Sequence, residues 1–120
     1  MQQDDIRKYL LTMKKLLKSG CKLTIVSRTK DKNFFFMYLY QLTNEKIKEI
    51  LLSLKEDEFK ENLYSTHPDH LGEELYVWNP TRTLIAQDGS KVTEKIYIKT
   101  HIDEKKKLVV TISFHRYGDI

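Results

Sequence analysis

The strongest constraint on the fold is a pair of alternating segments near the end of the chain. Residues 92–102 read VTEKIYIKTHI, and after the charged run DEKKK the chain continues as LVVTISFHRY. Apolar and polar side chains alternate with a period of two in both segments, which is the pattern of a strand with one buried face. We therefore predict an antiparallel hairpin whose strands span about residues 92–102 and 107–116.

The register of this hairpin decides which side chains share a face. The apolar positions are Ile96, Ile98 and Ile102 in the first arm, and Leu108, Val110, Ile112 and Phe114 in the second. Placing apolar opposite apolar requires even-numbered residues to pair with even-numbered ones, and so a loop of odd length around Lys105. This register brings Tyr97 and His115 together on the polar face. Lys95 and Lys99 lie beside them, so this face is either a solvated surface or one that handles phosphate.

Three segments of the N-terminal half predict helices. Residues 4–19 carry an apolar stripe at helical spacing and are followed by a glycine, which commonly ends a helix. Residues 44–54 show the same spacing, and Thr43 or Asn44 can cap their start. Between them, FFFMYLY at 34–40 is apolar throughout, so its period does not separate a buried helix from a buried strand. We favour a short helix there, because a helix start follows directly.

Shorter strand signals fill the rest of the chain. They occupy residues 22–27, 59–66, 74–78 and 83–86, and the Asp-Gly pair at 88–89 predicts a hairpin turn after the last of them. Alternation in the second segment places Phe59 and Leu63 on one face and Lys60 on the other. Together the elements predict an α+β fold in which N-terminal helices pack on an antiparallel sheet, as one domain over residues 1–120.

Composition limits the class of protein. A chain of 120 residues with 40% hydrophobic residues, 4 Gly and 2 Pro suits one compact domain. The net charge of +4 at pH 7 mildly favours a polyanionic partner. Cys21 is the single cysteine, which excludes an internal disulfide and leads us to expect a cytoplasmic location. The sequence shows no signal peptide and no apolar run near the ~20 residues that span a bilayer, so we expect no membrane partner.

Several kinds of enzyme site have no signal in the sequence. There is no glycine-rich phosphate loop, no CxxC pair, no HExxH and no paired carboxylate spacing. His67, Asp69 and His70 suggest a metal site, but too few further ligands stand at workable spacing, so we expect no metal and no cofactor. An enzyme would have to use Lys, Tyr, His and Arg, an inventory suited to metal-free RNA cleavage by general acid–base catalysis and cationic stabilisation of the transition state.

The order of elements resembles a known family. A helix ending in glycine is followed by LTNEKIKEILLSLKEDEF, a Pro-Asp-His segment, a strand with tyrosine in KIYIK, and a last strand VVTISFH. This resembles the motility quorum-sensing regulator (MqsR) family of type II toxins, over about residues 6–115. The resemblance implies a RelE-like fold, cleavage of single-stranded mRNA by a ribosome-independent endoribonuclease, and neutralisation by a cognate antitoxin protein.

The resemblance also implies catalytic residues. The family's strand tyrosine matches Tyr97, and the position after the Ser-Phe pair is His115, where the best-known pattern has lysine. The family's Tyr-Lys pair appears here as Lys60-Glu61, which displaces Lys60 by one position. The strand alternation selects Tyr97 and His115 without the family, and it permits Lys60.

We therefore predict Tyr97, His115 and Lys60 as catalytic residues, and Lys95, Lys99 and Arg116 as residues that bind the RNA phosphates. We expect His115, on a polar face near the chain end, to support little of the core. The altered pattern keeps a second function open: a non-catalytic binding protein on the same fold, such as an antitoxin or a phage-encoded inhibitor of a host system.

Overall fold

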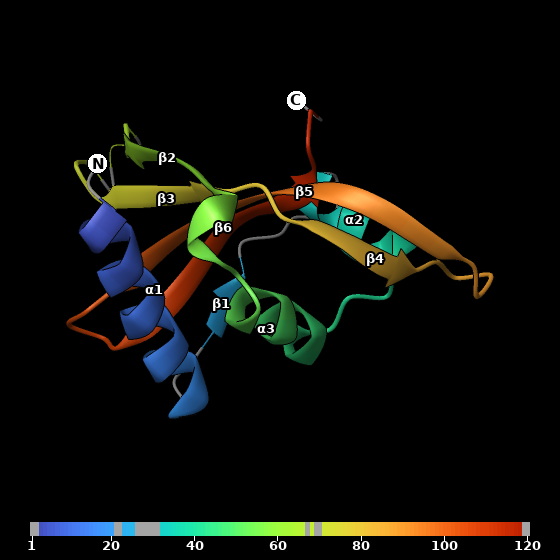
Figure 1. The fold of residues 1–120 in the computed structure, drawn as a ribbon, viewed down its shortest axis with the longest axis horizontal. Coiled ribbons are helices and arrows are strands. Elements are labelled where there is room, and N and C mark those ends of the chain that lie inside the picture. Colours follow the sequence, from blue (N-terminus) through green and yellow to red (C-terminus); the bar gives the residue numbers. More distant parts are fainter. Residues whose placement is uncertain (1–2, 21–22, 26–31, 67, 69–70, 119–120) are drawn as a thin grey trace.

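The computed structural model describes residues 3–20, 23–25, 32–66, 68 and 71–118 (Figure 1). In chain order the elements are α1 (Gln3–Lys18), β1 (Leu23–Ile25), α2 (Lys32–Leu39), α3 (Asn44–Leu52), the 3-10 turn η1 (Glu56–Glu58), β2 (Phe59–Tyr64), β3 (Glu74–Trp78), β4 (Thr81–Ile85), β5 (Lys91–Asp103) and β6 (Leu108–Arg116). The predicted helices and the C-terminal hairpin are confirmed, and so is the α+β class. Thr43 caps α3 by accepting a hydrogen bond from the backbone N–H of Lys46, as its sequence position indicated.

The six strands form one sheet in the order β1-β6-β5-β3-β2, with β4 also paired to β5. All the pairs are antiparallel except one: β1 runs parallel to β6, with Leu23 opposite Val109. The predicted antiparallel sheet is therefore wrong at this edge, where β1 is parallel to its neighbour. A short strand far from its partner in the sequence carries no local signal of its direction, which depends on how the chain returns to the sheet.

Strands β3 and β4 act as one interrupted partner of β5. Trp78 pairs with Ile98 and Thr81 with Lys95, so both strands keep the same register along β5. The break falls at Asn79-Pro80, where proline has no N–H to give to the ladder; the Pro80 carbonyl still accepts from the N–H of Ile96 at 2.8 Å. Beyond this break, β4 and the first part of β5 form a two-stranded arm that extends from the body (Figure 1).

One face of the sheet carries the core. Helices α1 and α3 lie together below the sheet in Figure 1, and their apolar stripes are buried against it. On α1 the ring of Tyr9 stacks on Tyr76 at 3.6 Å between centroids, and its hydroxyl lies 2.8 Å from the Thr100 hydroxyl. The Thr100 hydroxyl also accepts a hydrogen bond from the indole N–H of Trp78 at 3.2 Å. We call this side of the sheet the helix face, and the other side the outward face.

A β-bulge changes the register within the hairpin. Lys99 pairs with Ser113 but Thr100 pairs with Thr111, so Ile112 is an extra residue in β6. The loop has four residues (104–107), and the expected odd length is wrong. Between the bulge and the loop the alternation of β6 is reversed, because one inserted residue turns the following side chains to the other face. The predicted apolar face of Leu108, Val110 and Ile112 is therefore wrong as well: the buried positions there are Val109 and Thr111.

A second irregularity lies in β2. Phe59 pairs with Trp78 and Glu61 with Val77, which leaves Lys60 as the extra residue. From Glu61 onward the faces are exchanged, so Leu63 pairs with Leu75 on the outward face and does not share a face with Phe59. The predicted alternation of this strand is wrong for that reason.

The buried side chain of Asn33 in α2 closes the edge of β6 at its bulge. Its amide nitrogen Nδ2 donates to the carbonyl of Ile112 at 2.8 Å, and its Oδ1 accepts from the backbone N–H of Phe114 at 2.9 Å. Phe36, one turn later, places its ring 6.2 Å from that of Phe114. Past the end of β1, one side-chain amide thus makes the backbone hydrogen bonds that a neighbouring strand would otherwise make.

We expect Asn33→Ala to lower the free energy of unfolding by about 1–3 kcal/mol, because it leaves buried backbone groups of β6 without this partner. The measurement is urea unfolding, with Asn44→Ala as the control; Asn44 is exposed at the start of α3, and its substitution should change stability by no more than about 0.5 kcal/mol. Equal effects of the two substitutions would contradict the role given to Asn33.

Candidate active site

Tyr97 and His115 lie directly opposite each other on β5 and β6. Their rings stack at 5.2 Å between centroids with an interplanar angle of 13°. The adjacent pair, Ile98 and Phe114, is buried on the helix face. The predicted placement of Tyr97 with His115, on the face away from Ile98 and Phe114, is confirmed.

Three lysines and a second tyrosine surround this pair. The Lys60 ammonium lies 5.9 Å from the centre of the Tyr97 ring and 4.9 Å from that of Tyr117, whose hydroxyl is 3.5 Å away. Lys99 lies 5.9 Å from the Tyr97 ring, and Lys95 lies 4.3 Å from the Tyr117 ring. We call these six residues the Tyr97 cluster: Lys60, Lys95, Tyr97, Lys99, His115 and Tyr117. Five of the six predicted site residues meet here.

His115 is held in a defined orientation. Its side chain is buried, with 5% of the residue exposed, and its Nδ1 lies 3.0 Å from the carbonyl oxygen of Arg116. A carbonyl oxygen only accepts, so Nδ1 carries the hydrogen in this contact. Nε2 then has a lone pair when the ring is neutral and a proton to give when the ring is charged. The ring of His115 is packed against Tyr97 on the outward face, and neither residue is part of the hydrophobic core cluster.

Tyr97 is a proton donor at neutral pH. Burial raises the pKa of its phenol above the usual value, and the negative charge of Glu61 raises it further, while Lys60 acts in the opposite direction. A phenol with a raised pKa keeps its hydrogen and can donate it to an anionic oxygen. It is a poor candidate for a base.

Glu61 borders the cluster and brings a carboxylate to it. Its Oε2 lies 3.8 Å from the Lys60 ammonium, and the side chain is 41% exposed. Neither Glu61 nor Tyr117 was among the predicted site residues. Tyr117 could have been found from strand alternation, since it follows His115 by two positions. Glu61 could not, because its side depends on the bulge at Lys60.

Arg116 lies outside the cluster. It pairs with Ile96 and so points to the helix face, where its guanidinium contacts the Glu94 carboxylate at 2.8–3.1 Å. The Tyr40 hydroxyl also donates to Glu94. The structure therefore does not bring Arg116 to the other predicted phosphate-binding residues. Adjacent residues of a strand point to opposite faces, so the alternation that selects His115 already separates it from Arg116.

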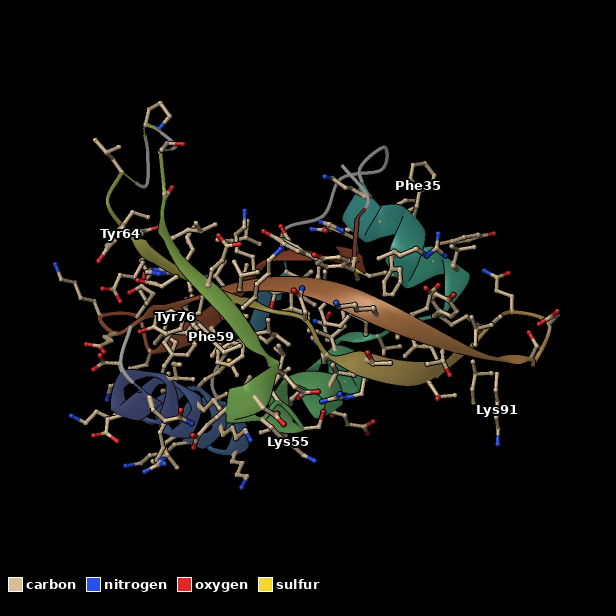
Figure 2. The ribbon with its side chains drawn as sticks, turned by 45° about the horizontal axis from the view of Figure 1, so that its top comes forward. Phe35, Lys55, Phe59, Tyr64, Tyr76 and Lys91 are labelled. Atoms are coloured by element: carbon tan, nitrogen blue, oxygen red, sulfur yellow. The ribbon has the colours of Figure 1, made fainter. Side chains whose placement is uncertain are left out.

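A cleft of about 840 Å³ lies next to the cluster, between α1 and the outer strands, and Lys60 is part of its lining. Phe59, Tyr64 and Tyr76 gather at this end of the molecule (Figure 2). The lining of the cleft has more carboxylates than lysines. The carboxylates are Asp5, Glu61, Glu74 and Glu104, and the lysines are Lys8 and Lys60. That balance disfavours an anionic ligand, so the Tyr97 cluster rather than the cleft is the candidate phosphate site.

Two further observations concern other functions. No three His, Cys, Asp or Glu side chains gather into a possible metal site within the part of the chain that the structure describes, and His67, Asp69 and His70 lie outside it. In the same part of the chain, no helix has the length and apolarity to cross a membrane.

Comparison with protein-family models, characterised proteins and solved structures found no match.

The pairing of Arg116 with Glu94 predicts how stability depends on pH. Hydrogen bonds from Arg116 lower the pKa of Glu94 below its unfolded value, against the opposing effect of burial. A depressed folded-state pKa stabilises the fold above the unfolded pKa of about 4.3, and that stabilisation is lost as the pH falls through the folded pKa.

We therefore expect Glu94→Gln to unfold more easily than the original chain at pH 7, by about 1.5–3 kcal/mol, and the difference to shrink towards zero as the pH falls below about 4. Urea unfolding at pH 7 and at pH 3 measures it, with exposed Glu45→Gln as the control. A difference that stays constant over this range would show that the ion pair is not its source.

Proposed function

We propose that this protein is a metal-independent endoribonuclease that cleaves single-stranded mRNA, with the Tyr97 cluster as its active site. The observation that supports the proposal is the stacked Tyr97–His115 pair with Lys60 and Lys99 near the Tyr97 ring and Lys95 near Tyr117, all on one sheet face. A phenol, an imidazole and ammonium groups suit metal-free RNA cleavage, since they can transfer protons and stabilise negative charge. They come from three strands, so the fold gathers them although the sequence separates them.

The lysines suit the charge that develops in the reaction. Attack of the ribose 2′-oxygen on phosphorus produces a phosphorane with extra negative charge on its oxygens. Fixed cations and hydrogen-bond donors stabilise that charge more than they stabilise the ground state. Lys60 and Lys99 flank the Tyr97 ring and would take this role together with the phenol.

His115 and Glu61 suit the two proton transfers. Glu61 would accept the proton of the 2′-hydroxyl as the oxygen attacks phosphorus. His115, protonated on Nε2, would give its proton to the leaving 5′-oxygen. The bond from phosphorus to the 5′-oxygen breaks as the bond to the 2′-oxygen forms, which yields a 2′,3′-cyclic phosphate and a 5′-hydroxyl.

We further propose that the chain acts as a toxin of the MqsR family on a RelE-like fold, in the cytoplasm, and that a cognate antitoxin neutralises it. The support is the order of the sequence elements together with the positions of Tyr97, His115 and Lys60. At position 115 this chain has histidine where the best-known pattern of the family has lysine, and an imidazole can both accept and give up a proton.

The first test concerns His115. We expect His115→Ala to slow single-turnover cleavage of a short RNA by at least ~10²-fold, the usual contribution of a positioned general acid. His115→Phe should be equally slow, because it keeps a ring for stacking on Tyr97 but has no proton to transfer. The control is His101→Phe, which replaces a histidine outside the Tyr97 cluster. The Nδ1 of His101 lies 2.9 Å from the Glu74 carbonyl oxygen.

Unfolding measurements must first show that each variant is folded, since His115 is buried. Cleavage by folded His115→Phe at the original rate would remove His115 from the site. An original chain that binds RNA but does not cleave it would instead favour a non-catalytic binding protein.

The second test concerns metal. Because the proposed roles belong to side chains alone, cleavage should proceed at the same rate after EDTA treatment. The measurement is the single-turnover rate with and without chelator, on RNA purified free of divalent ions. Activity that disappears with EDTA and returns with magnesium or zinc would contradict the proposed acid–base mechanism.

A further inference from the structure

The outward face of the arm continues the Tyr97 cluster as an unbroken row of donors. Odd-numbered residues of β5 point to this face, and from the tip of the arm inward they are Lys91, Thr93, Lys95, Tyr97 and Lys99. Lys91, Thr93 and Lys95 are exposed. Figure 2 shows Lys91 extending from the arm near its tip. Every side chain in the row can donate a hydrogen bond to a phosphate oxygen.

The neighbouring strands add donors of the same kind. Thr83, Thr81, His115 and Ser113 lie opposite this row, and the apolar residues opposite it are Ile85, at Lys91, and the buried Val77, at Lys99. The hydroxyls of Thr83 and Thr93 lie 3.1 Å apart. Among the described residues of β4, β5 and β6, no carboxylate points to this face between Lys91 and Lys99. Glu94, the acidic residue within that stretch, is on the helix face with Arg116.

The row has a regular charge spacing. Lysines recur at every fourth residue of an extended strand, about 13 Å apart and about 26 Å from first to last. That length suits about four nucleotides of an extended single strand, the lower end of the range for sheet-based single-strand binders. The right-handed twist of a two-stranded ribbon turns successive side chains about the strand axis, so a bound strand would wind along the arm.

The composition of this face distinguishes nucleic acid from protein as its partner. Protein interfaces have apolar, aromatic centres and are depleted in lysine. Here the exposed strand residues on the outward face of the arm are lysines and threonines, with Ile85 at the margin, and the turn at the tip adds Gln87, Asp88 and Ser90. Lysine and hydroxyl donors are the groups that contact a phosphate backbone without reading its sequence.

We propose that the outward face of the arm binds single-stranded RNA on one side of the scissile phosphate, with Lys91, Thr93 and Lys95 holding successive backbone phosphates. The inference rests on the proposed function, since it takes the Tyr97 cluster as the place of cleavage. It adds a substrate-length requirement: nucleotides that reach the arm increase affinity, and nucleotides on the other side of the cleaved bond do not.

Salt dependence of binding is the first measurement. The probe is a 12-nucleotide RNA with 2′-O-methyl riboses, which cannot be cleaved. We expect Lys91→Gln to weaken binding several-fold at low salt and to reduce the slope of log affinity against log salt by about 0.7, and Lys91→Gln with Lys95→Gln by about twice that. The control is Lys46→Gln on α3, an exposed lysine away from this face, which should leave the slope unchanged.

Substrate length is the second measurement. Unmodified RNAs extended by one to five nucleotides on either side of the cleaved bond should show kcat/KM rising with extension on one side only. Lys91→Gln should reduce that rise, and Lys46→Gln should not. Equal effects of the two substitutions, or no effect of either, would overturn the role of the arm even where cleavage is observed. Binding with the expected slopes but no cleavage by the original chain would overturn the proposed catalysis and leave the arm as a binding surface.

Discussion

Pairing between β5 and β6 is the contact on which the rest of the structure depends. β5 has 13 residues and borders β6 on one side and both β3 and β4 on the other. Ile98 and Phe114 pair on the helix face and are fully buried. Because side chains alternate, the register that joins these two also stacks Tyr97 on His115. One register therefore determines both the core on the helix face and the candidate site on the outward face, and a slip by one residue would disrupt both.

This register is reached by a bulge rather than by the loop. A four-residue loop pairs Asp103 with Leu108, which sets odd against even. The extra Ile112 then restores even against even for Ile98 and Phe114, and the amide of Asn33 in α2 binds the backbone on both sides of it. The demand that apolar residues face each other was therefore a sound guide to the site. The bulge that produces this register could not be inferred from the sequence, because the side chain that binds it belongs to a helix almost 80 residues away.

The same division between local and distant causes explains the other outcomes. Helices α1 and α3 were predictable because an apolar stripe and the Thr43 cap are local features. The direction of β1 and the bulge at Lys60 were not, since both depend on the strand that lies alongside. Lys60 was predicted to point away from Phe59 by simple alternation, and it does reach the Tyr97 cluster. The bulge that exposes it also brings Glu61 to the outward face, which simple alternation would not allow.

Charge is distributed differently on the two faces of the sheet. On the helix face the arginines are matched by carboxylates: Arg116 contacts Glu94, and Arg82 contacts Glu58 at 2.6 Å. On the outward face the cluster's lysines contact aromatic rings, with Glu61 at the border of the cluster.

The cation–π contacts of the cluster's lysines stabilise the fold only modestly. An exposed contact of this kind contributes about 0.5–1 kcal/mol. Repulsion between the lysines of β5 is smaller still, because about 13 Å separates residues four positions apart on a strand and salt screens charges at that distance. A polyanion lying along the outward face would add charge-assisted contacts between its phosphates and these ammonium groups, which the free protein lacks. That gain is the physical reason to propose the face as a binding surface for RNA.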